Sequence, residues 1–510
     1  MNGLVERYGG LLMLFAGAVA VTAFAPFGWY PLASIALAIL FNQWLDDSPW
    51  RAMRHGALVG AGFFGAGISW VYVSIHTFGH VHPLPAGLVT ALLIAFLSTY
   101  PAILGYVLKR FRPAYSLPAM VAMFPAGWVL SEWFRGWVFS GFPWLSIGTS
   151  QIDGPLGGLA PVAGVPGIGL AVGISAALLV ALWRGPRRLL SLSAAVAIWL
   201  GAYGLGQVEW TQPRGDALKV ALVQGNIPQE QKWVPDNLMN TLGRYTGLSF
   251  NEPDIDLFVW PETAIAAFHH EVAETFLPQL EEQLQEHGSD LVTGIPVLDR
   301  ESWRYYNAVF SLGGEQGFYY KQHLVPFGEY LPLRWLIGTT LDALAVPNAD
   351  FSSGGAGQTL LNAAGVPVSA SICFEVVFGE QIIRDLPEAA LLVNVSNDAW
   401  FGDSLAPHQH LEMARMRARE TGRPMLRSTN TGISAVIDAR GNIVIRSPQF
   451  EEAVVTATVQ PYQGATPYVL TGNWPVLTLS ALLVLLPLAA GSPPGRKSIF
   501  TAGTQRKQKT

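Results

Sequence analysis

Seven apolar stretches, each close to the length needed to cross a bilayer, follow one another in the first 213 residues. They lie at about 9–26, 30–45, 56–75, 86–108, 115–131, 157–183 and 189–207. A helix needs roughly 20 apolar residues to cross the hydrocarbon core of a bilayer. Seven such stretches in a row would leave a soluble domain almost no polar surface. We therefore predict a bundle of seven transmembrane helices over residues 1–213.

Charged residues are spread very unevenly along the chain. They make up 13% of the 510 residues, about half the share of a typical soluble domain. Residues 1–213 hold 16 of the 67 charged side chains (31 basic plus 36 acidic), residues 214–460 hold 46, and residues 461–510 hold five, all basic. This distribution predicts a membrane domain (1–213), a soluble domain (214–460), and a last part (461–510) with an eighth transmembrane helix at about 474–491 and a basic tail.

The basic residues also predict the orientation of the chain, because Lys and Arg concentrate in cytoplasmic loops. With the amino terminus inside, the inner loops and the tail hold 14 Lys and Arg, whereas the short outer loops hold one, Arg135. Both termini are then cytoplasmic, and residues 214–460 lie on the outer, periplasmic face. That segment has 16 basic and 30 acidic residues, a balance that argues against a nucleic-acid partner.

The middle segment has the texture of an α/β domain. Short β-rich runs bounded by turn residues predict eight strands, at 217–227, 254–260, 289–297, 307–314, 365–374, 389–397, 432–444 and 452–460. Apolar residues three and four apart predict helices at 271–287 and 408–421. Alternating strands and helices indicate a layered α/β domain.

The chain contains one cysteine, Cys373, so neither an intramolecular disulfide nor a thiolate metal cluster is possible. A lone cysteine is often a buried apolar thiol. Cys373, however, ends the apolar run VSASIC and begins a turn. A nucleophile at such a strand end is held rigidly and presented to substrate.

Two charged residues could assist a thiol nucleophile, which needs a base and a cation for the developing oxyanion. Glu262 follows a predicted strand and the rigid Trp260–Pro261 pair, whereas Lys321 lies among aromatic residues, with Glu329 eight residues further on. Each charge alone is typical of a solvated surface. In the order Glu, Lys, Cys they indicate a catalytic set.

The motifs that carry these residues are WPETA, YYKQHLVPFGEYLP and ICFE. They resemble the Glu–Lys–Cys pattern of the nitrilase (carbon–nitrogen hydrolase) superfamily. Combined with the membrane spans, GNIPQEQKW at 225–233 and NVSNDAWFG at 394–402, the chain resembles the apolipoprotein N-acyltransferase family over nearly its whole length. The resemblance implies a nitrilase-like αββα sandwich on the periplasmic side of a membrane bundle of about eight helices in the bacterial inner membrane.

The resemblance also implies roles for individual residues. Glu262 would be the base, Lys321 the oxyanion stabiliser and Cys373 the nucleophile. Supporting or substrate-binding positions are matched by Trp233, Glu329, Phe374 and Glu375. Tyrosine is often found where this chain has Phe374, so a hydrogen bond there is in doubt although aromatic packing can persist.

The implied reaction is acyl transfer without a cofactor. A phospholipid, phosphatidylethanolamine by resemblance, would donate an acyl chain to Cys373, and the α-amino group of the diacylglyceryl-cysteine of an apolipoprotein would then accept it. One alternative is a membrane-tethered amidase or nitrile hydrolase with the same triad. Another is a transporter or scaffold, for which Glu132 with Arg135 is the candidate intramembrane cluster.

Three further features could have either a functional or a structural role. The apolar run at 331–350, with Trp335 and Leu336, is either a loop packed into the domain or a membrane-touching lid. Arg415, Arg417 and Arg419 form either a solvated helix face or a phosphate contact. The pairs His80–His82 and His408–His410 lack matching acidic or sulfur ligands, so no metal site is predicted.

Overall fold

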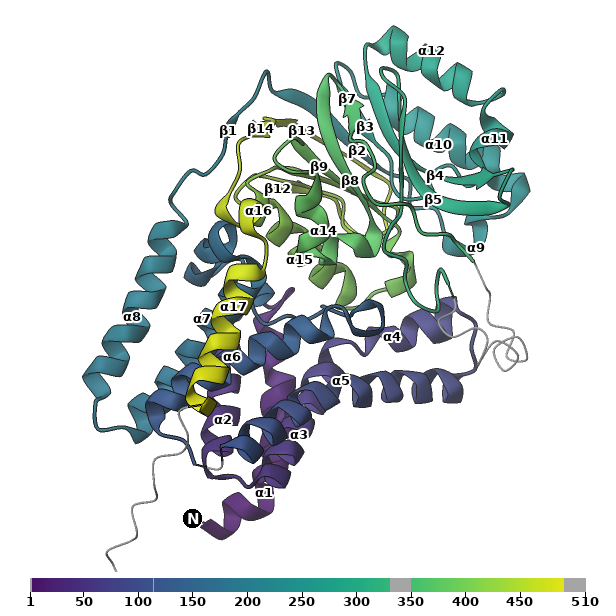
Figure 1. Cartoon of the computed structure of the whole chain (residues 1–510). Helices are drawn as coiled ribbons and strands as arrows, with labels where there is room; N and C mark the ends of the chain where they lie inside the picture. The colour runs from purple at the N-terminus through teal and green to yellow at the C-terminus, as the bar shows by residue number, and fades with distance from the viewer. Residues whose placement is uncertain (1, 113, 331–349, 490–510) are drawn as a thin grey trace, which may run out of the picture.

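The computed structural model describes residues 2–112, 114–330 and 350–489, and it consists of a helical half and a half built on two β-sheets (Figure 1). The helical half also includes α17 from the other end of the chain, which packs on α6 and α7. Its main helices are α1 (Asn2–Ala20), α2 (Pro31–Asp46), α3 (Pro49–Gly67), α4 (Trp70–Val73), α5 (Pro83–Phe111), α6 (Leu117–Arg135), α7 (Ala160–Arg184), α8 (Arg188–Leu205) and α17 (Trp474–Ala489).

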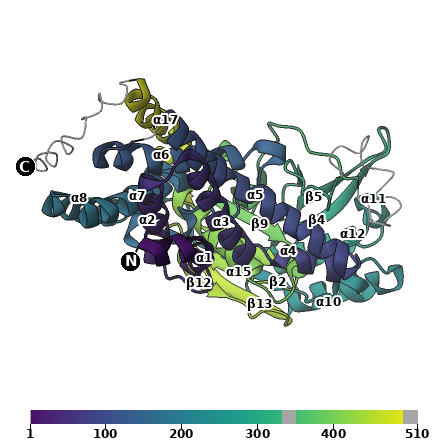
Figure 2. The same cartoon turned by 90° about the horizontal axis from the view of Figure 1, so that it is seen from below.

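Among the described residues, three helices are long and apolar enough to cross a membrane: α5, α8 and the stretch Pro155–Arg184 that includes α7. A fourth is obtained if α3 and the segment Trp70–Phe78, bent by 50° relative to it, form one span. Helix α8 stands at the side of the bundle in both views (Figures 1 and 2) and exposes leucines such as Leu189 and Leu200. Such a helix suits lipid rather than water. The count of seven spans plus one remains a prediction.

Glycines allow close packing within the bundle. Gly62 of α3 faces the carbonyl of Leu14 in α1, and Gly56 of the same helix faces the carbonyl of Pro101 in α5, each at a distance that leaves no room for a Cβ. Small residues at such crossings are typical of membrane helices, which associate by packing and not by the hydrophobic effect.

The other half is a sandwich of two six-stranded sheets. One sheet has the order β13 (Ala453–Val459), β2 (Leu218–Gln224), β3 (Leu257–Val259), β4 (Asp290–Asp299), β5 (Arg304–Leu312) and β6 (Gly317–Tyr320). The other has the order β12 (Ile443–Arg446), β11 (Ala435–Ile437), β10 (Met425–Thr429), β9 (Leu391–Ser396), β8 (Val366–Ile372) and β7 (Leu361–Ala363). Their facing sides enclose a buried aliphatic core that includes Val220, Leu222, Val368 and Val393.

Helices cover the outer face of each sheet, which completes the expected αββα layering. On one side α10 (Leu238–Phe250) and α12 (Leu277–His287) bury Leu242, Leu280 and Leu284 against the sheet. On the other side lie α14 (Gly379–Ile382) and α15 (Ala406–Thr421). Figure 1 shows these two helices between the sheets and the bundle, and α15 packs directly on α7. The helical layer that contains α14 and α15 therefore also forms the contact between the sandwich and the bundle.

Several elements differ from those predicted from sequence. The run at 432–444 splits into β11 and the start of β12, because the turn around Gly441 reverses the chain. Strands β6, β7 and β10 and helix α10 were not predicted. A two-stranded sheet of β1 (Gln212–Pro213) and β14 (Tyr462–Gln463) joins the chain where it leaves the bundle and where it returns.

The carboxyl ends of the parallel strands gather at one edge of the sandwich. In the second sheet β8, β9 and β10 run parallel, with Ile372 opposite Val395 and Ser396 opposite Thr429. In the first sheet β2 and β3 are parallel. The two edges are joined because the amide of Asn226, just after β2, donates to the carbonyl of Asn430, just after β10 (3.0 Å). Residues that follow these strands therefore meet.

Candidate active site

Cys373 lies at the first position after β8, with a φ of +51°. The left-handed region costs a non-glycine residue of order 1–3 kcal/mol and persists only where the surroundings enforce it. Here the carboxylate of Glu375 accepts the amide N–H of Ile372 (2.8 Å), and the carbonyl of Cys373 faces Nε2 of His410 (3.1 Å). The chain thus turns sharply and presents the thiol at the strand end, as the sequence predicts.

Glu262 follows β3 across the site, and two donors orient its carboxylate. Oε1 accepts from Nδ2 of Asn307 (2.7 Å), and Oε2 accepts from the amide of Asn397 (2.8 Å). Gly294 of β4 permits this approach, since a Cβ there would lie 2.7 Å from the Cα of Glu262. The carboxylate is therefore fixed by β5 and by the loop after β9.

Lys321 follows β6 and is almost fully buried, with 1% of its side chain exposed. Its Nζ lies 2.7 Å from Oε1 of Glu329 and 3.7 Å from Oε1 of Glu262. Glu329 is itself anchored, because its Oε2 accepts the amide N–H of Val325 (2.8 Å). The lysine is thus held between two carboxylates.

Asn307 is a site residue that the sequence did not single out. It lies on β5, and its Nδ2 donates to Glu262 and also to Glu329 (3.2 Å). Its Oδ1 is buried and accepts no hydrogen bond from the described residues. Its position at the start of the run NAVFSLGG was the only available signal, and this gives no hint of the carboxylates that meet it in space.

Glu375 links the turn at Cys373 to the segment that follows Lys321. Besides Ile372, its buried carboxylate accepts the amide N–H groups of Gln322 (2.7 Å) and His323 (3.0 Å), which follow Lys321. The Nε2 of Gln381 donates to it as well (2.8 Å). Burial raises the pKa of Glu375 despite these donors. The residue fixes Cys373 and Lys321 in one frame.

Phe374 packs on an aromatic side chain from the helical half. Its ring stacks on Trp144, with centroids 6.4 Å apart and an interplanar angle of 13°. Trp144 is fully buried and donates from Nε1 to Oε1 of Gln409 in α15 (2.7 Å). The bundle therefore contributes the support beneath the cysteine turn, and a phenylalanine makes this contact without a hydroxyl.

A buried polar network lies behind the carbonyl of Cys373. Nδ1 of His410 lies 3.2 Å from Oδ1 of Asp398, and Arg427 donates from Nη2 to Oδ2 of Asp398 (2.9 Å). Burial alone would raise the pKa of Asp398, but the charges of Arg427 and His410 hold it below its usual range. His410 is therefore committed to this network and not to a pair with His408.

The electrostatics of the site favour a neutral thiol at rest. Burial, reinforced by the charge of Glu262, raises the pKa of Cys373 to about 12, although Lys321 opposes the shift. Burial would lower the pKa of Lys321, but the carboxylates of Glu329 and Glu262 raise it above its usual value. Lys321 is thus a permanent cation, and the thiol must lose its proton as it reacts.

The remaining predicted residues are placed as follows. Trp233 follows Lys232 at the end of the helix Gln229–Lys232, with 52% of its surface exposed. Trp335 and Leu336 lie outside the described residues. Glu132 and Arg135 support the loop that carries Trp144: Glu132 accepts the amide N–H of Ile147 (2.9 Å), and Arg135 donates to the carbonyl of Trp144 (2.6 Å).

The expectation that the arginines of α15 form a solvated face is wrong. Arg417 is buried beside Glu420 (3.1 Å). Arg415 pairs with Asp153, and Arg419 donates to the carbonyl of Ile152 (2.6 Å), both in the loop before α7. Arg415 and Arg419 thus bind the sandwich to the bundle, a role that depends on long-range contacts, whereas Arg417 pairs within α15.

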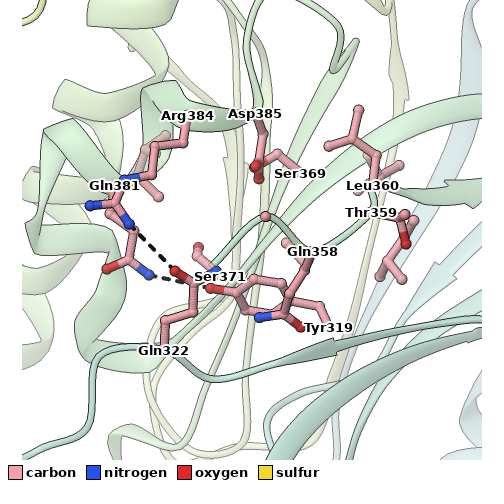
Figure 3. A pocket seen from close by; sticks show the side chains of 15 residues that line it. Tyr319, Gln322, Gln358, Thr359, Leu360, Ser369, Ser371, Gln381, Arg384 and Asp385 are labelled. Atoms are coloured by element: carbon pink, nitrogen blue, oxygen red, sulfur yellow. Dashed lines mark hydrogen bonds between the residues drawn. The ribbon is translucent and has the colours of Figure 1, made fainter. Parts of the chain in front are cut away.

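A polar cavity of about 130 Å³ lies behind this frame (Figure 3). Tyr319 and Gln381, which line it, both bond to Glu375, and the Ser369–Asp385 hydrogen bond (2.7 Å) lies across from them. Cys373 and Glu262 are not among its lining residues. The cavity is therefore distinct from the space in front of the thiol.

The fold and the site together define a class of protein, a carbon–nitrogen hydrolase domain joined to a membrane bundle. Residues 219–468 match the family model described as "Carbon-nitrogen hydrolase". Residues 16–178 match the model described as "Apolipoprotein N-acyltransferase N-terminal domain". The two models thus fall on the two halves of the structure.

Curated relatives extend this similarity over nearly the whole chain. An apolipoprotein N-acyltransferase of Methylococcus capsulatus is 48% identical, with 93% of this chain and 94% of the relative covered. Those of Nitrosomonas europaea (44% identical; 98% and 100% covered) and Pseudomonas syringae pv. tomato (41%; 93% and 95%) are also similar. The chain belongs to the apolipoprotein N-acyltransferase family.

Proposed function

We propose that this chain is the acyltransferase that moves an acyl chain from a membrane phospholipid to the α-amino group of the diacylglyceryl-cysteine of apolipoproteins, through a thioester on Cys373. The observation that carries the proposal is the left-handed turn of Cys373, opposite the Glu262–Lys321 pair (3.7 Å). It occurs in a chain 44% identical, over 98% of its length, to a curated N-acyltransferase.

In the first step, Glu262 takes the proton of the Cys373 thiol as the sulfur attacks the ester carbonyl of the phospholipid. Lys321 stabilises the oxyanion of the tetrahedral intermediate. Its collapse breaks the carbon–oxygen bond, and Glu262 returns the proton to the departing lysophospholipid oxygen. The acyl chain is then a thioester on Cys373, and Glu262 is again a carboxylate.

In the second step, the α-amino group of the apolipoprotein attacks the thioester, and Glu262 accepts a proton from the attacking nitrogen. The second tetrahedral intermediate breaks at the carbon–sulfur bond, and the proton passes to the sulfur. The product amide is more stable than the thioester, so transfer runs forward. Ping-pong kinetics follow, because the lysophospholipid leaves before the apolipoprotein reacts.

A hydrolase with the same triad would release the acyl group to water. The relatives named as N-acyltransferases and the match of residues 16–178 to the N-acyltransferase amino-terminal domain favour the transferase. An assay that supplies both phospholipid and a lipopeptide acceptor separates the two. The transferase yields lysophospholipid and acylated lipopeptide in equal amounts, and the hydrolase yields free fatty acid.

Mass spectrometry of protein purified from membranes tests the proposal directly. A fatty acyl mass is expected on the peptide that contains Cys373, and hydroxylamine should remove it because it cleaves thioesters. Cys373→Ala provides the matched control. Acylation of that variant, or an unmodified Cys373 in wild type supplied with phospholipid and no acceptor, would contradict the proposal.

The proposal includes a place of action and a donor. Both termini are cytoplasmic and the sandwich is periplasmic in the bacterial inner membrane, which is supported by the 14-to-1 distribution of Lys and Arg over the predicted loops. Phosphatidylethanolamine is the proposed donor. A membrane setting suits both substrates, because their acyl chains remain in the bilayer.

A further inference from the structure

A second buried lysine, Lys232, lies beside the catalytic base. It ends the short helix α9 (Gln229–Lys232) and is 5% exposed, although the next residue, Trp233, reaches the surface. Its Nζ donates to the backbone carbonyl of Glu262 (2.9 Å). An ammonium group can donate three hydrogen bonds. Among the described residues, Nζ of Lys232 makes this one.

The surrounding loops fix this lysine in place. Oε1 of Gln229, in the same helix, accepts from Nδ2 of Asn397 (2.8 Å), whose amide orients Glu262. Asn430 holds the preceding loop, since its side chain bonds both the amide (2.9 Å) and the carbonyl (2.8 Å) of Ile227. Helix α9 is therefore tied to the loops after β9 and β10 that border the thiol.

A buried ammonium is an expensive way to satisfy one carbonyl. Removing a charge from water costs several kcal/mol unless other charges compensate for it, and an amide donor would serve the carbonyl without that cost. Burial lowers the pKa of Lys232 to about 8, and the negative charge of Glu262 opposes the shift, as does that of Cys373 when its thiol is ionised. At rest the charge of Lys232 is thus supported by the base, and the nucleophile adds to this support once it loses its proton.

Asp398, near the thiol, is paired with Arg427. Among Glu262, Glu329, Lys321 and the thiol, the charges balance only when Lys232 is added. The carboxylate of Glu329 lies on Lys321 (2.7 Å) and neutralises it. When Glu262 takes the thiol proton, the sulfur and Glu329 carry two negative charges, which Lys321 and Lys232 match. Without Lys232, the site would hold one net negative charge with the thiolate, and again with each oxyanion.

We propose that Lys232 is a second cation of the active site, a positioning residue that compensates the charge of Glu329 so that Lys321 can stabilise the thiolate and the oxyanion. The inference rests on the proposed function of Cys373 as the nucleophile. The attraction between Lys232 and the thiolate is mutual, so the lysine favours the thiolate by as much as the thiolate favours the charged lysine.

Alkylation of the thiol by iodoacetamide tests this in the full-length protein, because Cys373 is the single cysteine of the chain. Below its pKa, the alkylation rate is proportional to the thiolate fraction. Lys232→Gln keeps a donor for the carbonyl and removes the charge. We expect alkylation about tenfold slower than in wild type near pH 7, as for a pKa raised by roughly one unit.

The shape of the pH profile separates a charge effect from a structural one. Glu262, Lys321 and Asp398 also bear charge around the thiol. These three residues are the same in wild type and in Lys232→Gln, so they do not cause a difference between the two proteins. As wild-type Lys232 loses its proton above about pH 8, the gap between wild type and Lys232→Gln should narrow. Lys232→Arg should match wild type below pH 8 and be alkylated faster than wild type above it, because arginine keeps its charge. Lys219→Met, at an exposed lysine, should not differ from wild type.

A folded Lys232→Gln protein that is alkylated at the wild-type rate across this range would overturn the proposal. So would a slower rate with a constant ratio to wild type at every pH. If Lys232→Gln does not fold, Lys232→Met serves the same test. Alkylation does not depend on acyl transfer, whereas a fatty acyl mass on wild-type Cys373 tests the proposed function separately.

Discussion

The thiol of Cys373 is neutral at rest because burial and the charge of Glu262 raise its pKa to about 12. The thiol must therefore give its proton to Glu262 in the course of the reaction, so the base, the cation and the nucleophile are all needed in the first step. A resting thiolate would instead be exposed to alkylation and oxidation between turnovers.

We expect Glu262→Gln, Lys321→Ala and Cys373→Ala each to lower acyl transfer by about a thousandfold or more, because removal of a base, an oxyanion donor or a nucleophile costs that much in comparable sites. Cys373→Ser should also fail, since a carboxylate base suited to a thiol is badly matched to a hydroxyl of far higher pKa. The measurement is acylation of a lipopeptide by purified protein.

Lys219→Ala, at an exposed lysine on β2, is the matched control for Lys321→Ala and should retain full activity. Substantial turnover by the Lys321 variant would assign the oxyanion to other donors, such as backbone amides. Turnover by Cys373→Ala would remove the thioester from the mechanism altogether.

The candidate set was predictable from sequence for a physical reason. Glu262 and Cys373 each follow an apolar strand, β3 in one sheet and β8 in the other, and the edges at which these strands end are joined in the sandwich. Asn307, Lys232 and Trp144 were not predictable in this way. They reach the site from an antiparallel strand, a four-residue helix and the other half of the molecule. A local sequence pattern does not show which residues far apart in the chain will meet in the fold.

Among the elements, α15 is the one that belongs to both halves. Its apolar residues pack in the same cluster as those of α7, and its polar residues reach the bundle backbone. Glu412 accepts the amide N–H of Ala25 (3.0 Å), and Glu420 accepts that of Val165 (2.8 Å), where α7 is kinked at Gly164. Both carboxylates satisfy amides freed by breaks in helices.

Glu420 should make the stability of the protein depend on pH. Burial raises its pKa from the usual 4.5 to about 7, although Arg417 opposes the shift. A group with a raised pKa in the folded state binds more protons there, so its contribution to stability is full below pH 4.5 and is lost as the pH rises through 7. We expect the unfolding temperature of wild type to fall between pH 5 and 8.

Glu420→Gln should show a flatter dependence over the same range, followed by circular dichroism of the helices during heating. Glu282→Gln, on the exposed face of α12, should behave as wild type. Parallel curves for wild type and Glu420→Gln would mean that the carboxyl group is ionised throughout, held by Arg417.

Strand β10 shows why some strands could not be predicted from the sequence. Its sequence, MLRST, carries an arginine in the middle and has no alternation, so it does not read as a strand. In the structure Arg427 is fully buried and paired with Asp398 (2.9 Å). The partner of Arg427, Asp398, lies 29 residues away in the chain. The sequence of the strand alone therefore does not show that the arginine can be buried.

At the scale of the whole molecule, the predicted orientation can be tested by two reporter fusions. A reporter active only in the periplasm should give signal when fused after Asp216, in the exposed loop before β2. The same reporter fused after Arg188, at the start of α8, should be silent, because 14 of 15 basic loop residues lie on that side. The reverse pattern would place the proposed active site in the cytoplasm.

The contact between the sandwich and the bundle also bears on how the chain is made. Val165 is translated 255 residues before its partner Glu420. At about 5–20 residues per second this is an interval of roughly 13–50 s. Throughout it, the amide at the kink of α7 lacks the carboxylate that accepts from it in the folded protein. The helical half is therefore synthesised before all of its hydrogen-bond partners exist. The partners that α15 supplies become available only after residues 406–421 have been made and have folded back onto the earlier helices.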